Sequence, residues 1–139
     1  MNPLPVLQSP PEPAGLLLFA HGARDPQWAR PFEAVANRCA AAIGRQRVAL
    51  AFLEFMTPDL VTAGKVLVNA GCTEIEVVPL FLGSGGHVRK DIPVLMARLQ
   101  ADHPSVRFRL RPAIGEAPAV VEAMAVAALA RDQAEVQVR

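Results

Sequence analysis

Apolar runs and helix-like patterns alternate along the chain from residue 14 onward. The run at residues 14–20 (AGLLLFA) has the length and composition of a buried strand. The next apolar residues are spaced by four, three, four and four positions, which is the spacing of one helix face. They are Trp28, Phe32, Val35, Cys39 and Ile43. We therefore predict a helix over residues 26–43, with Pro26 in its first turn and Gly44 just past its end.

The same alternation continues to residue 131. We predict further strands at residues 48–53, 74–82 and 106–110. Further helices are predicted at residues 58–70, around the apolar stripe of residues 88–99, and at residues 118–131. The last of these helices has Val120, Met124 and Ala127 on one face.

Particular residues refine these elements. Thr57 is a suitable N-cap for the second helix, with Pro58 as its first helical residue. Pro79 has no amide hydrogen to donate, so we expect it near the end of the third strand. Arg107 and Arg109 alternate with apolar neighbours, which predicts that the fourth strand is a half-exposed edge.

Strand–helix pairs in this order predict one α/β domain with a four-stranded parallel sheet flanked by helices on both faces. The length of 139 residues suits a single domain. We assign the domain to residues 14–131, with a disordered proline-rich tail at 1–13 and a C-terminal tail at 132–139. Ligands of such sheets bind beyond the carboxyl ends of the strands.

Composition narrows the classes of function. Hydrophobic residues make up 52% and charged residues 19%, which excludes disorder over most of the chain. A net charge of +1 argues against nucleic acid as a partner. The longest apolar run is too short to span a membrane, and no targeting segment is visible. The two cysteines cannot form a disulfide framework, so we expect a cytoplasmic protein.

Three chemically capable side chains follow predicted strands. His21 ends the first strand, Glu54 follows the second, and His87 lies beyond the third after a glycine loop. Each alone could be structural. Together, the two imidazoles could converge on a metal ion, and the carboxylate could act as a base or offset the charge of the metal. His103 lies on a polar connection and is assigned a structural or surface role.

The glycine loop before His87 could cradle a ligand. It consists of Gly83, Ser84, Gly85 and Gly86. The chain lacks both the GxxxxGK[ST] and the GxGxxG arrangement, so a nucleotide is weakly supported. Exposed amides and the nearby Arg24, Arg89 and Lys90 would instead suit a ligand that carries several carboxylates.

Three segments carry a resemblance to a known family. They are AHGARDP at residues 20–26, FLEFMTPDL at 52–60 and PLFLGSGGHVRKDIP at 79–93. In this order and at strand ends, they resemble the class II tetrapyrrole chelatases, and more closely the short CbiX/SirB-type sirohydrochlorin chelatases. The resemblance spans about residues 15–118. The family commonly has serine where this chain has Ala23, so a hydroxyl is missing beside His21.

The resemblance implies insertion of Co²⁺ or Fe²⁺ into sirohydrochlorin for cobalamin or sirohaem biosynthesis. It implies that His21 and His87 bind the metal and are catalytic, assisted by Glu54, while the glycine loop, Arg24 and Arg89 bind the substrate. The metal is then a substrate, and no permanently bound cofactor is expected. A non-catalytic metal or tetrapyrrole carrier is the main alternative, and a nucleotide-binding domain is a weaker one.

The resemblance also implies an assembly. One α/β unit of this size corresponds to a single chelatase-like half-unit, whereas larger class II chelatases resemble two units that face each other. A homodimer would recreate their cleft. We expect its interface to border the carboxyl ends of the strands, with contributions from Trp28, Phe55 and Met56.

Overall fold

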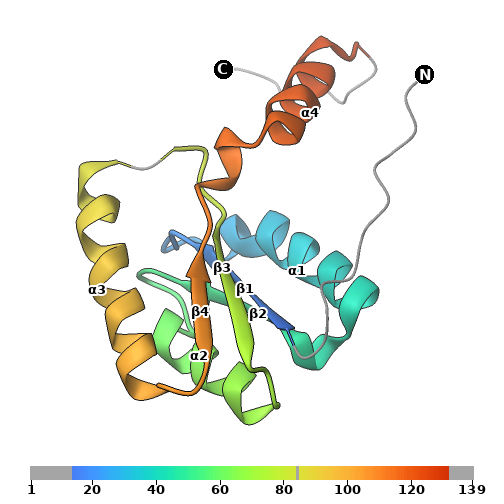
Figure 1. Cartoon of the computed structure of the whole chain (residues 1–139). Coiled ribbons are helices and arrows are strands. Elements are labelled where there is room, and N and C mark those ends of the chain that lie inside the picture. Colours follow the sequence, from blue (N-terminus) through green and yellow to red (C-terminus); the bar gives the residue numbers. More distant parts are fainter. Residues whose placement is uncertain (1–13, 84, 132–139) are drawn as a thin grey trace.

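The fold is a four-stranded parallel sheet with the strand order β2-β1-β3-β4 (Figure 1). The strands are β1 (Ala14–Ala20), β2 (Val48–Phe52), β3 (Glu74–Pro79) and β4 (Arg107–Leu110). The computed structural model describes residues 14–83 and 85–131, so both predicted tails lie outside the described residues. The predicted fold class is confirmed, and β4 is the expected edge strand.

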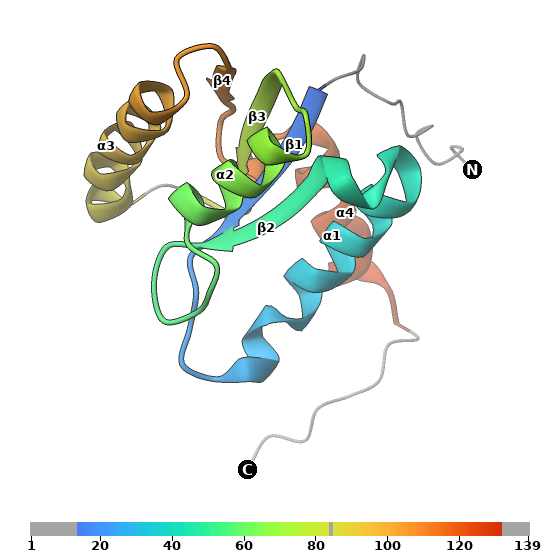
Figure 2. The same cartoon turned by 90° about the horizontal axis from the view of Figure 1, so that it is seen from below.

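Helices cover the two faces of the sheet unequally. The α-helices are α1 (Arg30–Ile43), α2 (Leu60–Asn69), α3 (Gly86–Asp102) and α4 (Pro118–Leu129), and the 3-10 helices are η1 (Pro26–Ala29), η2 (Arg45–Arg47) and η3 (Ile114–Glu116). Figure 2 shows α1 on one face and both α2 and α3 on the other. The α2–α3 face therefore carries the larger part of the core.

The main core lies between the sheet and the α2–α3 layer. Its largest fully buried side chains are Phe19, Leu17, Leu60, Leu67, Ile75, Leu99 and Val77. Burying one such side chain contributes about 1.5–3 kcal/mol, so this layer dominates the stability of the fold. A smaller cluster beneath α1 contains Ala20, Ala29 and Phe52, with Trp28 and Phe32 packed against it.

A buried arginine joins α1 to the sheet at the end where β1 begins. The Arg47 Nε donates to the Ala14 carbonyl oxygen at 2.7 Å, and Nη1 lies 3.5 Å from the Ile43 carbonyl oxygen. Arg47 is 8% exposed, and no other charged side chain in the described part of the chain is buried. Its hydrogen bonds satisfy the guanidinium and compensate for the cost of burying it.

Most predicted elements are confirmed, with shifted ends. Residues 14–20 form β1 as expected, whereas the third strand ends at Pro79 instead of residue 82. The proline lies at the strand end, as predicted, and the Leu80 amide still donates to Phe19. Val35 was expected in the buried stripe of α1, but it is 42% exposed because only part of this helix faces the sheet.

The predicted start of the second helix is wrong. Asp59, not Thr57, is the N-cap of α2, and the helix begins at Leu60. The Asp59 side chain accepts a hydrogen bond from the Thr62 amide at 2.8 Å. Pro58 instead belongs to the preceding loop, where its carbonyl oxygen accepts from the Phe52 amide. Thr57 and Asp59 are both residue types that cap helices. The return of the loop to β2 leaves Asp59 at the start of the helix.

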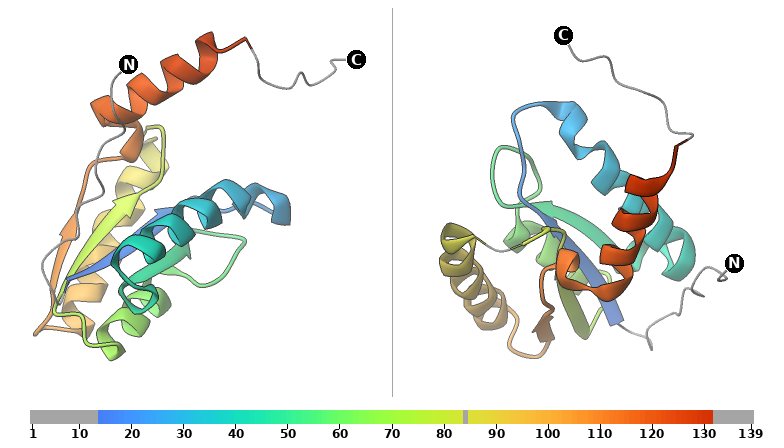
Figure 3. Two further views of the ribbon diagram at one scale, coloured as in Figure 1. Left: turned by 90° about the vertical axis from the view of Figure 1, so that its right-hand side faces the viewer. Right: turned by 90° about the horizontal axis from the view of Figure 1, so that it is seen from above.

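The final helix differs most from expectation. Helix α4 ends at Leu129, and none of its residues is buried. Val120, Met124 and Ala127 were expected to share a packing face, but α4 projects away from the sheet (Figures 1 and 3). In the described ranges no helix is long and apolar enough to cross a membrane.

Replacing Asp59 with alanine tests the observed cap. We expect the free energy of unfolding to fall by about 1 kcal/mol, the usual cost of losing an N-cap. Thr57→Ala is the matched control and should change it by less than about 0.5 kcal/mol. Urea denaturation of both variants measures the difference, and a larger effect at Thr57 would contradict this assignment.

The cap should also respond to pH. Hydrogen bonds from the Thr62 hydroxyl and amide hold the pKa of Asp59 below its ordinary value of 3.8. A lowered folded-state pKa stabilises the fold above the unfolded pKa, and this contribution is lost as the pH falls through the folded one. The stability difference between the parent protein and Asp59→Ala should therefore shrink below about pH 4.

Candidate functional site

The candidate site lies at the carboxyl ends of β1 and β2, where His21 and Glu54 meet. These strands are neighbours, with Ala20 paired to Phe52 in the parallel register. The His21 Nε2 lies 3.0 Å from the Glu54 Oε1. The two side chains are 42% and 41% exposed, so both remain accessible to a ligand. The structure thus brings together two of the three groups predicted to carry chemistry.

Backbone contacts beyond the strand ends set this geometry. The Leu53 amide donates to the Ala20 carbonyl oxygen at 2.9 Å, and the Glu54 amide donates to the His21 carbonyl oxygen at 3.1 Å. The ladder between β1 and β2 therefore continues through the residues that bear the functional groups. Because these hydrogen bonds fix the backbone of His21 and Glu54, the imidazole and the carboxylate face each other.

Gly22 permits the close approach of the two loops. Its φ is 96°, a conformation that side-chain-bearing residues rarely adopt. A Cβ at this position would collide with the carbonyl oxygen of Glu54. Position 22 therefore requires glycine for two reasons, its backbone conformation and its close contact with Glu54. Both residues of the dipeptide His21-Gly22 thus contribute to the site.

Phe55 and Arg24 form the rim beside Glu54. Phe55 has a φ of 66°, which is rare for a bulky residue and concentrates at functional sites. The Met56 amide donates to the Glu54 carbonyl oxygen at 2.8 Å and closes this tight turn. The Arg24 guanidinium lies 4.8 Å from the centroid of the exposed Phe55 ring. A cation thereby lies at the edge of the site.

The His21–Glu54 contact determines where the imidazole proton lies. An ionised carboxylate only accepts hydrogen bonds, so Nε2 must donate. In the neutral ring the lone pair is then on Nδ1, which can bind a metal or accept a proton. The Phe81 ring packs edge-on against the His21 ring, with the two ring centroids 6.3 Å apart. Phe81 follows β3, so the chain leaving the third strand also borders the site.

The third predicted group, His87, lies in the first turn of α3 (Gly86–Asp102). Its side chain and the whole of Ser84 lie outside the described residues, so their predicted roles stay predictions. Gly83, Gly85 and Arg89 are exposed nearby. The Arg89 amide donates to Gly85 at 3.0 Å and starts the helix at this loop. Gly83 and Gly85 are therefore accessible to a ligand.

The donor types at the site suit a transition metal. Imidazole nitrogen and carboxylate oxygen both bind divalent iron or cobalt. Among the described side chains, which leave out that of His87, no three His, Cys, Asp or Glu residues gather into one cluster. Burial raises the pKa of the Cys39 thiol and also that of Cys72. Both thiols therefore stay protonated near neutral pH and are poor ligands.

Two features of the site were missed in the sequence. Nothing in the residue types signals the left-handed backbone of Phe55, because phenylalanine disfavours it. The contact between Phe81 and His21 could have been suspected, because Phe81 follows a central strand. His103, assigned a structural or surface role, is half-buried, and its ring lies 6.2 Å from that of Phe108.

Comparisons with known proteins agree with this geometry. The family model CbiX matches residues 15–129. The sirohydrochlorin ferrochelatase of Bacillus subtilis is 33% identical over 109 residues, covering 78% of this chain and 42% of that protein. The sirohydrochlorin cobaltochelatase of Saccharolobus solfataricus is 34% identical over 96 residues, covering 68% and 71%. The chain thus spans less than half the length of the Bacillus relative.

A solved structure shares the fold closely. The CbiX protein from Marinobacter aquaeolei superposes with a TM-score of 0.74 and 35% identity, covering 84% of this chain and 94% of that one. The Marinobacter protein therefore consists almost entirely of the same fold.

Substituting Gly22 tests the loop approach. Gly22→Ala should lower the free energy of unfolding by at least about 1–2 kcal/mol, because the added Cβ meets backbone and the φ is unfavourable. It should also separate His21 from Glu54, which a shift of the His21 imidazole resonances by NMR would report. Gly83→Ala is the control, because a Cβ there meets nothing within 4 Å. Equal effects of the two substitutions would contradict the requirement for Gly22.

Proposed function

The chain belongs to the CbiX family, and from this we propose that it is a chelatase that inserts Co²⁺ or Fe²⁺ into sirohydrochlorin. The observation that carries the proposal is the contact between His21 and Glu54 at the carboxyl edge of the sheet. It lies inside the region matched by the family model, and the related sirohydrochlorin ferrochelatase and cobaltochelatase indicate the substrate and the two metals.

The reaction requires a base and a transient metal ligand. Inserting M²⁺ removes the protons from two pyrrole N–H groups, and each proton must pass to a base. With Nε2 donating to Glu54, the free Nδ1 of His21 can hold the incoming ion or accept a pyrrole proton. Glu54 stabilises the imidazolium that proton uptake creates. The exposure of the pair lets solvent carry the proton away.

We assign His87 as the second metal ligand and the rim cations to the substrate. The support for His87 is its place in the first turn of α3, six residues after Phe81, whose ring borders His21. Arg24 and Arg89 are exposed and can pair with carboxylates of the tetrapyrrole. The amides of residues 83–86 are assigned to the same carboxylates. The metal is a substrate in this scheme, with no permanently bound cofactor.

We also propose a cytoplasmic homodimer in which two sites face one cleft. The free thiols of Cys39 and Cys72 suit a reducing compartment. The exposed site and the 57% exposed Phe55 suit a flat ligand held between two copies. Met56 and Trp28 lie beside this edge and are half-buried. The product would enter either cobalamin or sirohaem biosynthesis, according to the metal inserted.

Removing either histidine should abolish most of the activity. We expect His21→Ala and His87→Ala each to lower the rate of metal insertion by about 100-fold or more, because a base or ligand is lost. Absorbance changes of sirohydrochlorin, recorded separately with Co²⁺ and Fe²⁺, measure the rate. His103→Ala is the matched control and should retain the activity.

The same assay separates a chelatase from a carrier. A folded histidine variant with parental turnover would remove that histidine from the mechanism. Tight binding of tetrapyrrole or metal by the parent protein without any turnover would replace the chelatase with a carrier.

Glu54→Gln should affect turnover more than substrate affinity. Glutamine keeps the shape of the side chain but cannot offset the charge of the imidazolium. We expect kcat to fall by about tenfold or more with little change in KM, and the pH dependence of kcat to shift. Steady-state kinetics over a range of pH measure both. Identical profiles for the two proteins would limit Glu54 to a structural role.

A further inference from the structure

Helix α4 is an apolar helix of which no residue is buried by the described part of the chain. Glu122 is the one polar residue among its 12 residues, and the apolar ones occur on every side of the helix. Val121, Met124, Val126 and Leu129 are 52%, 43%, 61% and 81% exposed. A helix that is apolar on all sides is normally buried. Within the described residues, η3 is the element that packs most closely against it, at its start.

The 3-10 helix η3 precedes α4 and packs against the domain, which sets the direction in which α4 leaves it. The Gly115 amide in η3 donates to the Phe81 carbonyl oxygen at 2.9 Å. A Cβ at Gly115 would collide with the backbone of Leu82. This glycine lets η3 lie directly on the segment that follows β3. From there α4 leaves the domain as a projecting arm (Figure 3).

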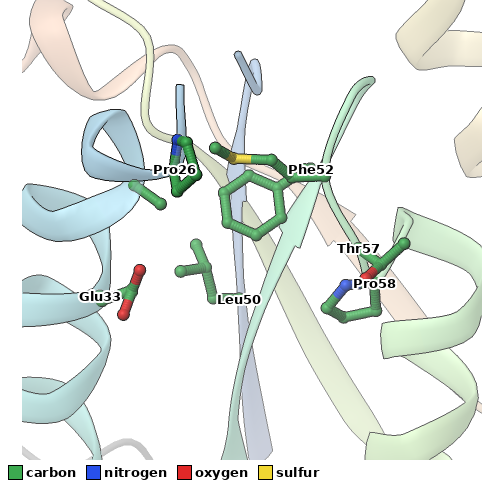
Figure 4. Close-up of a pocket in the computed structure, with 8 residues that line it drawn as sticks. Pro26, Glu33, Leu50, Phe52, Thr57 and Pro58 are labelled. Atoms are coloured by element: carbon green, nitrogen blue, oxygen red, sulfur yellow. The ribbon is translucent and has the colours of Figure 1, made fainter. Parts of the chain in front are cut away.

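The same chain offers an apolar groove that no part of α4 lines. The groove has a volume of about 420 Å³ and lies between α1 and the edge strand β2. Leu50 and Phe52 of β2 point into it, and Pro26 and Glu33 lie on the opposite wall (Figure 4). Ala29 and Met56 complete its apolar surface, and Glu33 is the charged residue that lines it.

We propose that α4 of one copy packs into the α1–β2 groove of a second copy, and that the exchange is reciprocal. A two-fold pair uses each arm and each groove once, so the assembly closes at two copies. A 12-residue helix is about 18 Å long and about 10 Å wide, so two exchanged arms would bury roughly 1,100 Å² in total. This clears the lower bound of about 1,000 Å² for a biological interface and is typical of a weak dimer.

The chemistry of the two surfaces favours a second copy held by apolar contact. Each surface carries one carboxylate, Glu122 on the arm and Glu33 on the groove, so ion pairing cannot supply the affinity. Phe52 and Met56, which line the groove, flank Glu54 in the sequence. The exchange therefore continues the interface proposed for the homodimer. It rests on that dimer but not on the proposed metal chemistry.

Charged substitutions on the arm test the exchange. Sedimentation velocity over a dilution series should show a dimer for the parent protein, with an affinity that 1 M NaCl does not weaken. Val121→Glu combined with Met124→Glu should weaken dimerisation by at least about 100-fold, because charges would enter an apolar interface. Val66→Glu combined with Val94→Glu is the matched control, since these exposed residues lie on α2 and α3. It should leave the dimer intact.

Mixing two defective variants distinguishes exchange from an arm that folds back on its own chain. Leu50→Lys blocks the groove but keeps the arm. Thr57→Arg, at the exposed groove rim, serves the same purpose if the first variant does not fold. Neither the arm variant nor a groove variant should form a stable dimer alone. A mixture should form a heterodimer with one intact arm–groove pair, at an affinity between those of the parent and the variants.

Three results would overturn the proposal: a parent protein that is monomeric at 100 µM, a dimer that the arm substitutions leave unchanged, or a mixture that stays monomeric. Metal insertion into sirohydrochlorin, measured in parallel on the same samples, reports the proposed function separately from the mass.

Discussion

The parallel pairing of β1 with β2 continues past the ends of both strands, and the candidate site depends on that continuation. Two further backbone hydrogen bonds join the exits of the strands, and Gly22 allows the exits to touch. Because these are main-chain contacts, they position His21 and Glu54 without using either side chain. The backbone thereby fixes the positions of the two residues, and their side chains contact each other while staying accessible to a ligand.

The strength of the His21–Glu54 pair suits a transient ligand. Ion pairs that are about two-fifths exposed contribute at most about 1 kcal/mol, because water screens them. A metal ion or proton that binds at Nδ1 leaves this weak contact at Nε2 in place. The stability of the domain resides elsewhere, in the apolar layer beneath α2 and α3. Separating the two regions lets the site exchange its partners without loosening the fold.

The sequence predicted the parts of this fold that follow from periodicity. The run of β1, the proline at the end of β3 and the exposed edge at β4 are all local consequences of residue type. The placement of His21 and Glu54 also followed, because adjacent strands deliver their exits to the same edge of the sheet.

Long-range geometry accounts for the predictions that failed. Asp59 caps α2 in place of Thr57 because the preceding loop returns to Phe52, a contact that no local pattern records. The periodicity of α4 predicted a helix correctly, but periodicity does not say which surface covers a helix. The backbone of Phe55 could not be foreseen either, since its conformation opposes its own preference.

The two ends of β1 have different surroundings, and Arg47 is buried at the end where the strand begins. Its guanidinium fastens the start of β1 to the end of α1, far along the strand from His21. At that end the amides are sheltered and should exchange their hydrogens with solvent slowly. At the other end, loops and exposed side chains surround the histidine. One seven-residue strand thus has a shielded end held by a buried side chain and another end that leads to the accessible functional group of His21.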